Sequence, residues 1–170
     1  MISIKTFVYD FLILLSNFLV KHTKKKDIIL FNSFPDFSDN AIYLYRYIMK
    51  NRPDLIRKYK LVWVVKKIPI DGIDLEMNVV LKKSIKGFWL MLHSKYIVIT
   101  HNYYYGYVSS KGQTIINLWH GCGFRGMKNE DIKYSNGDCN IVTSDEFISS
   151  HSRAFKIPSE KILVTGLPRN

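Results

Sequence analysis

A series of short apolar segments recurs along most of the chain, each bounded by polar or turn-forming residues. Their content of Val, Ile and Leu is nearly continuous, which is typical of strands that are buried on both faces of a sheet. Longer stretches with helical spacing separate many of them. This alternation predicts an α/β fold, a Rossmann-like parallel sheet with helices on both faces. The predicted strands cover residues 27–33, 59–65, 78–81, 95–100, 113–118, 139–143 and 161–165.

Helical spacing is clearest between the first two of these strands. Residues 38–51 carry apolar side chains at intervals of three and four, which predicts an amphipathic helix. Ser38 suits the N-cap of this helix, and Pro53 lies just beyond its end. Two further helices are predicted over residues 84–94 and 144–156.

The amino-terminal segment, residues 2–20, is mostly apolar. Its polar interruptions, Ser3, Thr6, Asp10 and Asn17, share one helical face. Its longest unbroken apolar run is far short of the ~20 residues that a membrane span needs, and no small-residue cleavage site follows. Since lysines and a histidine follow at 21–26, residues 1–26 are expected to form an amphipathic basic helix. This helix either contacts an anionic membrane surface or packs on the domain, and the sequence leaves both open.

Size and composition indicate one globular domain with an anionic partner. The chain has 170 residues, 47% of them hydrophobic, and a net charge of +11. Nucleic acid is not expected, because no helix-turn-helix, zinc-finger or RNP motif is present and the lysines cluster at the amino terminus. The two cysteines, Cys122 and Cys139, lack metal-ligand spacing and fit a reducing compartment. No metal and no cofactor is expected.

The strongest candidate for chemistry is His120, which directly follows the apolar strand 113–118 and Trp119. In open α/β sheets ligands bind at the carboxyl ends of strands. Gly121 and Gly123 would let the backbone approach a ligand closely. A histidine in this place can act as a general base, although a structural loop histidine would have the same pattern.

Other strand ends also carry polar groups. His101 follows the fourth strand, where a supporting role is more expected than catalysis, and a tyrosine cluster follows it at positions 103, 104, 105 and 107. That cluster is interpreted as either a ligand contact or an amphipathic surface loop. Arg125 and Lys128 lie downstream of His120, and Arg169 follows the last strand. Basic side chains at this edge fit a phosphate-bearing ligand.

Four short motifs together resemble the CDP-glycerol glycerophosphotransferase family, the teichoic acid primases and polymerases of Gram-positive bacteria. They are Asp39-Asn40 before a tyrosine-rich helix, Trp119-His120-Gly121, the strand–helix junction 139–144, and Gly166-Leu167-Pro168-Arg169-Asn170. Each motif is weak alone, but their order and spacing are fairly specific. The resemblance covers about residues 27–170.

The resemblance implies a GT-B architecture of two Rossmann-like domains. It also implies transfer of glycerol phosphate from CDP-glycerol to a lipid-linked polyol phosphate acceptor, at the cytoplasmic face of the cell membrane as a peripheral protein. His120 matches the family's catalytic base. The residues expected to bind substrate are Asp39, Asn40, Trp119, Gly121, Arg125 and Arg169.

The sequence departs from the family pattern at two places. Cys122-Gly123 stands where the family usually has Thr-Pro, and no aspartate follows Asn170. Residues 27–170 are therefore expected to be an acceptor-side domain, with the carboxy-terminal donor domain absent or present as a separate chain. Two alternatives stay open. One is the acceptor domain of another GT-B glycosyltransferase that uses a nucleotide sugar, and the other is a non-enzymatic membrane-associated module.

Overall fold

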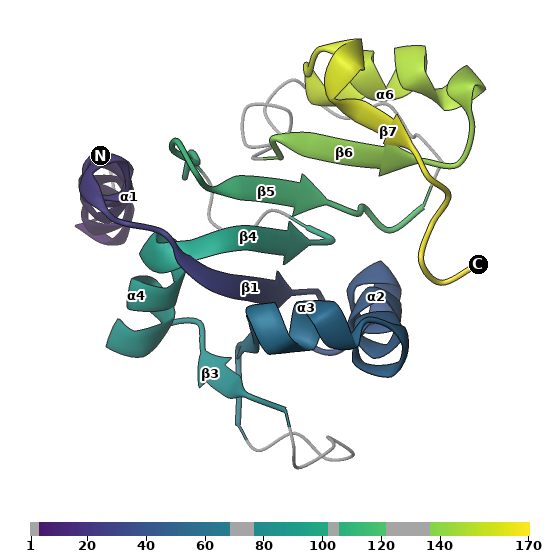
Figure 1. Ribbon diagram of the computed structural model, residues 1–170. Coiled ribbons are helices and arrows are strands. Elements are labelled where there is room, and N and C mark those ends of the chain that lie inside the picture. Colours follow the sequence, from purple (N-terminus) through teal and green to yellow (C-terminus); the bar gives the residue numbers. More distant parts are fainter. Residues whose placement is uncertain (1–3, 69–76, 102–105, 122–136) are drawn as a thin grey trace.

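A seven-stranded sheet forms the centre of the protein (Figure 1). The computed structural model describes residues 4–68, 77–101, 106–121 and 137–170. The strand order is β3-β2-β1-β4-β5-β6-β7, and every neighbouring pair is parallel. The Rossmann-like parallel sheet is thus confirmed, and each predicted segment forms a strand. The strands are β1 Lys26–Asn32, β2 Lys60–Val65, β3 Val79–Leu81, β4 Ser94–Ile99, β5 Thr114–Asn117, β6 Cys139–Val142 and β7 Ile162–Val164.

Helices cover both faces of this sheet, as predicted. The described helices are α1 Ile4–His22, α2 Asp39–Asn51, α3 Pro53–Lys58, α4 Ile85–His93 and α6 Ile148–Phe155, with short 3-10 turns η1 Asp145–Phe147 and η2 Ser159–Lys161. The prediction for 144–156 was one helix, but its first turn is η1. The pattern missed α3 because Pro53 was interpreted only as the end of the preceding helix. Proline also suits the first turn of a helix, where its missing N–H is not needed.

Two apolar clusters, one on each face, explain why the central strands are apolar throughout. Leu30 of β1 belongs to the cluster that α1 and α4 cover, whereas its neighbour Phe31 belongs to the cluster under α2. Both side chains are fully buried. Successive strand residues point to opposite faces, so a strand between two helical layers needs an apolar residue at every position.

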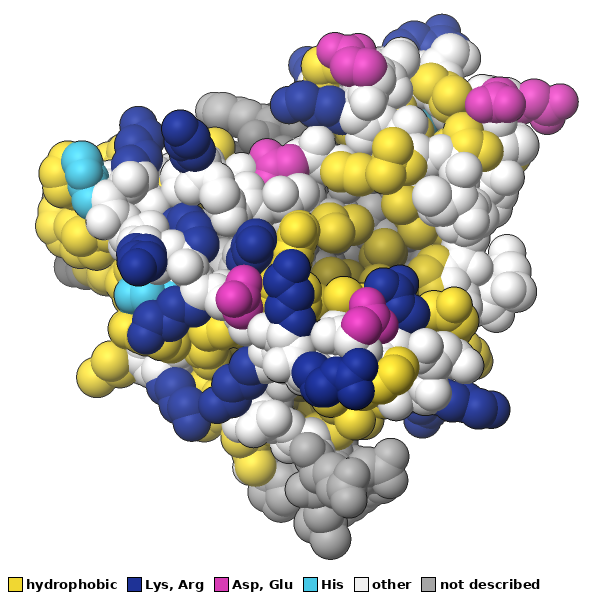
Figure 2. Space-filling view, viewed as in Figure 1, with side chains coloured by type: hydrophobic (Ala, Val, Ile, Leu, Met, Phe, Trp, Pro, Cys, Tyr) yellow, Lys and Arg dark blue, Asp and Glu magenta, His cyan; other side chains and the backbone are white. Residues whose placement is uncertain are grey.

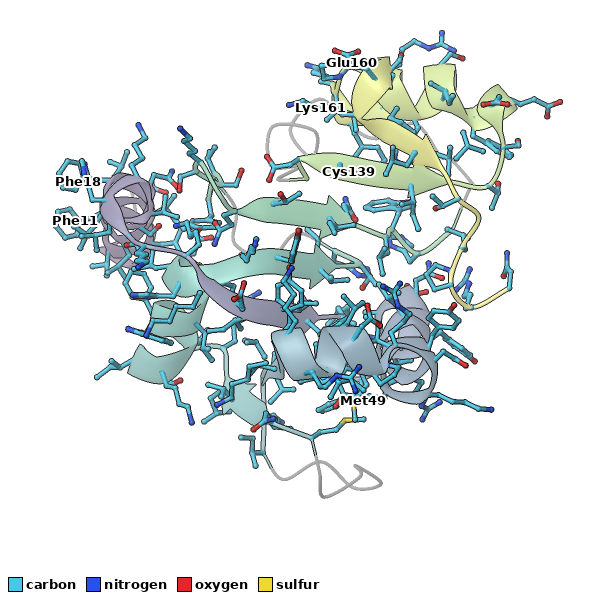
Figure 3. The ribbon with its side chains drawn as sticks, viewed as in Figure 1. Phe11, Phe18, Met49, Cys139, Glu160 and Lys161 are labelled. Carbon is cyan, nitrogen blue, oxygen red and sulfur yellow. The ribbon has the colours of Figure 1, made fainter. Side chains whose placement is uncertain are left out.

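Helix α1 packs on the sheet through Ile13, Leu19 and Val20 and leaves a second apolar stripe outward. Ser16 is buried, and Asn17 pairs with the loop before β5, donating to the Gly106 carbonyl at 2.8 Å and accepting from the Val108 N–H at 2.9 Å. Phe11 and Phe18 point away from the body of the molecule (Figure 3). The outward residues are between 38% and 70% exposed, and they are Val8, Phe11, Leu12, Leu14, Leu15 and Phe18.

The lysines at the carboxyl end of α1 and directly after it, Lys21, Lys24, Lys25 and Lys26, divide into two groups. Lys25 donates from Nζ to the carbonyls of Val20 and Leu92, at 2.8 Å each, and so joins the carboxyl ends of α1 and α4. Burial lowers the pKa of Lys25. The remaining lysines, Lys21, Lys24 and Lys26, are exposed. Among the helices in the described ranges, none is both long and apolar enough to cross a bilayer.

Tyr107 corrects part of the tyrosine prediction. It is fully buried rather than on a surface loop, and its hydroxyl donates to Gln113 Oε1 at 2.7 Å. Gln113 in turn donates from Nε2 to the carbonyls of Met91 and Ser94, at 2.8 Å each. Burial raises the pKa of Tyr107. The tyrosines at 103–105 lie outside the described residues.

Candidate functional site

The strand order reverses between β1 and β4, and the site is expected at their carboxyl ends. The chain progresses from β1 to β2 and β3 on one side, then continues with β4 on the other, so the order reverses between β1 and β4. Ligands of open α/β sheets bind at such a switch point. The loops that follow β1, β4 and β5 converge there. His101 and His120 lie on the loops after β4 and β5, and Asp39 and Asn40 form the first turn of α2, which follows the loop after β1.

The ring of His120 lies against the end of β4. Its Nδ1 is 3.3 Å from the carbonyl oxygen of Thr100. A carbonyl only accepts hydrogen bonds, so this contact favours the tautomer with a proton on Nδ1. The Nε2 atom then carries the lone pair, which is the state that a general base requires.

His101 supports His120 from one side. The two imidazole rings stack with centroids 4.4 Å apart, and Thr100 Oγ1 is 3.2 Å from His101 Nδ1. Phe34, at the end of β1, meets the other side of His101 edge-on at 5.7 Å. Burial and the neighbouring His120 lower the pKa of His101, which favours its neutral form.

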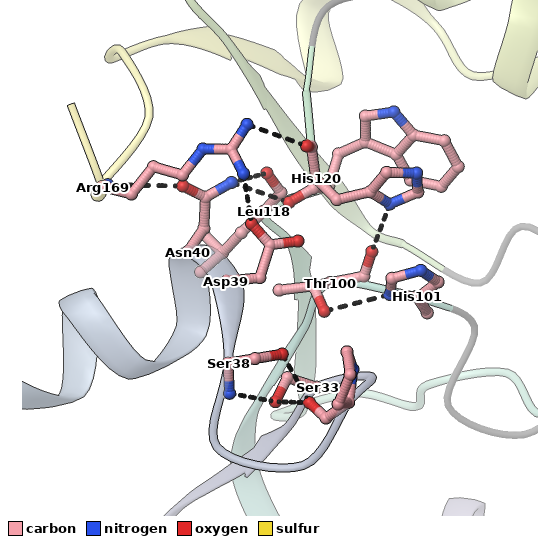
Figure 4. Close-up of polar contacts among 11 residues, drawn as sticks. Ser33, Ser38, Asp39, Asn40, Thr100, His101, Leu118, His120 and Arg169 are labelled. Carbon is pink, nitrogen blue, oxygen red and sulfur yellow. Dashed lines mark hydrogen bonds and ion pairs between the residues drawn. The ribbon is translucent and has the colours of Figure 1, made fainter.

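Two side chains from distant segments, Asn40 and Arg169, hold the loop that carries His120 (Figure 4), and Asn117 adds a local contact. Asn117 Oδ1 accepts from the Trp119 N–H at 3.0 Å. Asn40 Nδ2 donates to the carbonyls of Leu118 at 3.4 Å and Trp119 at 2.8 Å. The guanidinium of Arg169 donates to the His120 carbonyl at 3.0 Å.

Arg169 and α2 are also joined directly. Arg169 Nη1 lies 3.0 Å from Asp39 Oδ1, and its backbone N–H donates to Asn40 Oδ1 at 3.3 Å. Asn40 is fully buried, whereas the Arg169 side chain is 38% exposed. One residue near the end of the chain thus contacts the first turn of α2 and the backbone of His120.

The structure brings together almost all of the residues expected at the site. His120, Trp119, Gly121, Asp39, Asn40 and Arg169 lie at one edge of the sheet, and Arg125 lies outside the described residues. Gly121 has φ of 155°, a conformation in which a side chain would be strained. The contacts of Asp39, Asn40 and Arg169 are made with each other and with the protein backbone.

Two contributors to the site were not predicted, Thr100 and Asn117. Each is the polar residue that ends an otherwise apolar strand segment, and that position is the signal that could have identified them. Both are fully buried.

Two lysines lie at the same edge of the sheet, after β2 and β3. Lys66 Nζ lies 3.8 Å above the ring of Phe34. Burial and Lys66 lower the pKa of Lys82 to about 8.

The fold and the site define a Rossmann-like α/β protein with a histidine poised at the ligand edge of its sheet. The family model for CDP-glycerol:poly(glycerophosphate) glycerophosphotransferases matches residues 14–170. The chain belongs to that family. Within the described residues, no group of three or more His, Cys, Asp or Glu side chains could hold a metal ion.

Solved structures of the wall teichoic acid polymerase TagF have the same fold. One aligns with 99% of this chain at a TM-score of 0.72 and 20% sequence identity. A histidine-to-asparagine variant of TagF soaked with CDPG aligns with 97% of the chain, also at a TM-score of 0.72 and 20% identity. Each alignment covers 48% of the TagF chain, so this chain spans about half the length of these solved structures. No curated protein sequence matches the chain significantly.

Proposed function

We propose that this chain forms the acceptor-side half of an enzyme that transfers glycerol phosphate from CDP-glycerol to a polyol phosphate acceptor linked to lipid. Family membership supports the reaction class. The single observation that supports the active site best is the contact between His120 Nδ1 and the Thr100 carbonyl, because it prepares Nε2 to accept a proton.

In the proposed reaction, Nε2 of His120 removes the proton from the terminal hydroxyl of the acceptor. The acceptor oxygen forms a new bond to the phosphorus that carries glycerol, and the bond from that phosphorus to the bridging oxygen breaks. CMP leaves with the bonding electron pair. Basic groups at the same edge, Lys66 and Lys82, favour anionic phosphates by charge.

The domain of residues 27–170 supplies one wall of the proposed site. A ligand site of this size usually buries most of its ligand in a cleft, and the TagF structures are about twice as long as this chain. We assign the binding of the cytidine nucleotide to a second domain, on the same polypeptide or on another. Arg125 keeps its proposed role as a phosphate ligand.

Helix α1 supplies the proposed contact with the cytoplasmic face of the membrane. Figure 2 shows hydrophobic side chains at the edge where α1 lies, with lysine side chains beside them. Phe11, Leu14 and Phe18 follow the spacing of one helical face, and each is more than half exposed. An apolar stripe with adjacent lysines is typical of helices that lie in the interface of anionic bilayers.

The proposed membrane contact and His120 lie at opposite ends of the sheet. Lys25 joins α1 to Leu92 in the last turn of α4, just before β4, whereas His120 contacts Thr100, directly after β4. Six residues of strand span roughly 20 Å. An acceptor hydroxyl must therefore reach a point well above the headgroups, which favours a polymer of polyol phosphate over a single lipid headgroup.

The proposed reaction is tested with the complete enzyme, this domain together with its donor half. We expect His120→Gln to lower the rate of glycerol phosphate transfer by ~10²-fold or more, the usual contribution of a general base. Equal turnover by a folded variant would remove His120 from the mechanism. Turnover of UDP-sugars in place of CDP-glycerol would support the nucleotide-sugar alternative.

A further inference from the structure

The backbone that carries His120 has an uncommon conformation. Trp119 has φ of 50°, in the left-handed region that non-glycine residues rarely occupy. A residue stays in such a conformation only when its surroundings hold it there. The contacts that hold Trp119 therefore also decide where the next residue, His120, directs its ring.

Within the described residues, hydrogen bonds from four other positions hold this turn: Ile99, Asn117, Asn40 and Arg169. The Leu118 N–H donates to the Ile99 carbonyl at 2.8 Å, and the Trp119 N–H donates to Asn117. The carbonyls of Leu118 and Trp119 accept from Asn40, and the carbonyl of His120 accepts from Arg169. The turn is thus fixed at each successive peptide group.

We propose that Asn40 and Arg169 are positioning residues for His120 rather than substrate ligands. Asn40 is fully buried, and its amide is occupied by two backbone carbonyls and one backbone N–H. The two Nη atoms of Arg169 are divided between Asp39 and His120. Together these contacts hold the backbone so that the imidazole meets the Thr100 carbonyl.

Asp39 takes part through Arg169. Its carboxylate lies 3.0 Å from Nη1, and its side chain is only 11% exposed. The planar guanidinium can reach the carboxylate and the His120 carbonyl at once because its donors form a rigid fork. A lysine has a single ammonium on a flexible stem, so it cannot reproduce both contacts in this geometry.

The inference rests on the proposed role of His120, but its first test does not need activity. In the 170-residue chain, long-range ¹H–¹⁵N spectra report which ring nitrogen of His120 carries the proton. We expect the Nδ1–H tautomer in the unaltered chain. In Arg169→Met and Asn40→Ser, the two ring nitrogens should shift toward each other as the tautomers average, while the buried His151 keeps its signals.

Arg52→Met is the matched control. Arg52 also makes a forked contact, in this case with the single carboxylate of Asp54 at 2.9 and 2.7 Å on an exposed surface. Its removal should leave the His120 signals unchanged. Arg169→Lys should give ring signals close to those of Arg169→Met, because the charge alone does not restore the fork.

In the complete enzyme, Arg169→Met should lower kcat by ~10-fold or more and change the KM for CDP-glycerol by less than about 2-fold. The reason is that the substitution displaces His120 without removing a side chain that binds the substrate. Unchanged His120 signals in both Arg169→Met and Asn40→Ser would overturn the proposal, and so would a raised KM at constant kcat. Loss of the cooperative fold in Arg169→Met and Arg169→Lys alike would assign the contact to stability and also overturn it. Failure of the base role is seen separately, in the His120→Gln assay.

Discussion

The imidazole rings of His101 and His120 lie face to face, with their planes within 9° of parallel. Two imidazolium ions at this separation would repel each other, so a positive charge on one ring disfavours a positive charge on the other. Burial and the neighbouring His120 lower the pKa of His101. A positive charge on the His101 ring is therefore disfavoured.

This relationship separates the roles of the two histidines. His101→Phe keeps an aromatic ring against His120 and Phe34, so we expect the complete enzyme to retain activity within about 10-fold. His120→Gln should cost ~10²-fold or more. Steady-state transfer rates for the two variants give the comparison, with circular dichroism to verify the fold. A larger loss in His101→Phe than in His120→Gln would exchange the two assignments.

The sequence predicted every strand of the sheet because the central strands are buried on both faces, and such strands need apolar residues throughout. It predicted the site edge for a related reason, since polar residues at strand ends stand out against apolar segments. It did not reveal the role of Asn40 or Arg169, whose contacts join positions 129 residues apart. Pairing over such a distance depends on strand order, and the order in space cannot be read from local periodicity.

The orientation of α1 was also beyond the sequence. Its pattern has an apolar majority, and either side of the helix could have faced the sheet. Packing is decided by particular partners. Val20 belongs to a core cluster against which Ile13 and Leu19 pack, and Asn17 pairs with the Gly106–Val108 backbone. These contacts place the stripe of exposed apolar residues outward.

The outward stripe predicts a specific loss of membrane binding. Phe11→Ser together with Phe18→Ser should greatly reduce sedimentation of the 170-residue chain with anionic liposomes. It should leave the melting temperature nearly unchanged, because the two rings are 58% and 62% exposed. Tyr47→Ser, at a position 56% exposed on α2, is the matched control and should bind like the unaltered chain. Equal sedimentation of the double variant would place any lipid contact elsewhere.

The lysines beside α1 should differ in effect. Each lysine near an anionic surface contributes about 1 kcal/mol, so the exposed Lys21, Lys24 and Lys26 together contribute ~3 kcal/mol at low salt. Lys24→Gln should weaken liposome binding about fivefold and reduce its salt dependence. Lys25→Gln should instead lower the melting temperature, because Lys25 joins the ends of α1 and α4. Identical behaviour of the two variants would contradict this division.

His151 predicts a loss of stability in acid. Burial lowers its pKa from 6.5 to about 4, and its Nε2 lies 3.0 Å from Asn140 Nδ2. Between these pH values the unfolded chain binds a proton that the folded chain does not, so the free energy of unfolding falls as the pH falls from about 6.5 to 4. His151→Gln, which does not titrate, should flatten this part of the profile by on the order of 1 kcal/mol. Urea unfolding at pH 7 and pH 4.5 measures the difference, and parallel profiles would show that another group is responsible.

The buried pair of Tyr107 and Gln113 predicts a large and coupled stability effect. Gln113→Leu removes the nearer acceptor of the Tyr107 hydroxyl, which also lies 3.3 Å from the Met91 carbonyl, and removes the donor for two backbone carbonyls. Leaving a buried polar group without its partner costs about 1–3 kcal/mol, so we expect the free energy of unfolding to fall by ~3 kcal/mol or more. Tyr107→Phe alone should cost ~1–2 kcal/mol, because the amide of Gln113 retains its two carbonyl contacts. In the double variant the loss should be smaller than the sum of the two single-variant losses, because both substitutions remove the same hydrogen bond between Tyr107 and Gln113. Strict additivity in urea unfolding would show that the two side chains contribute independently.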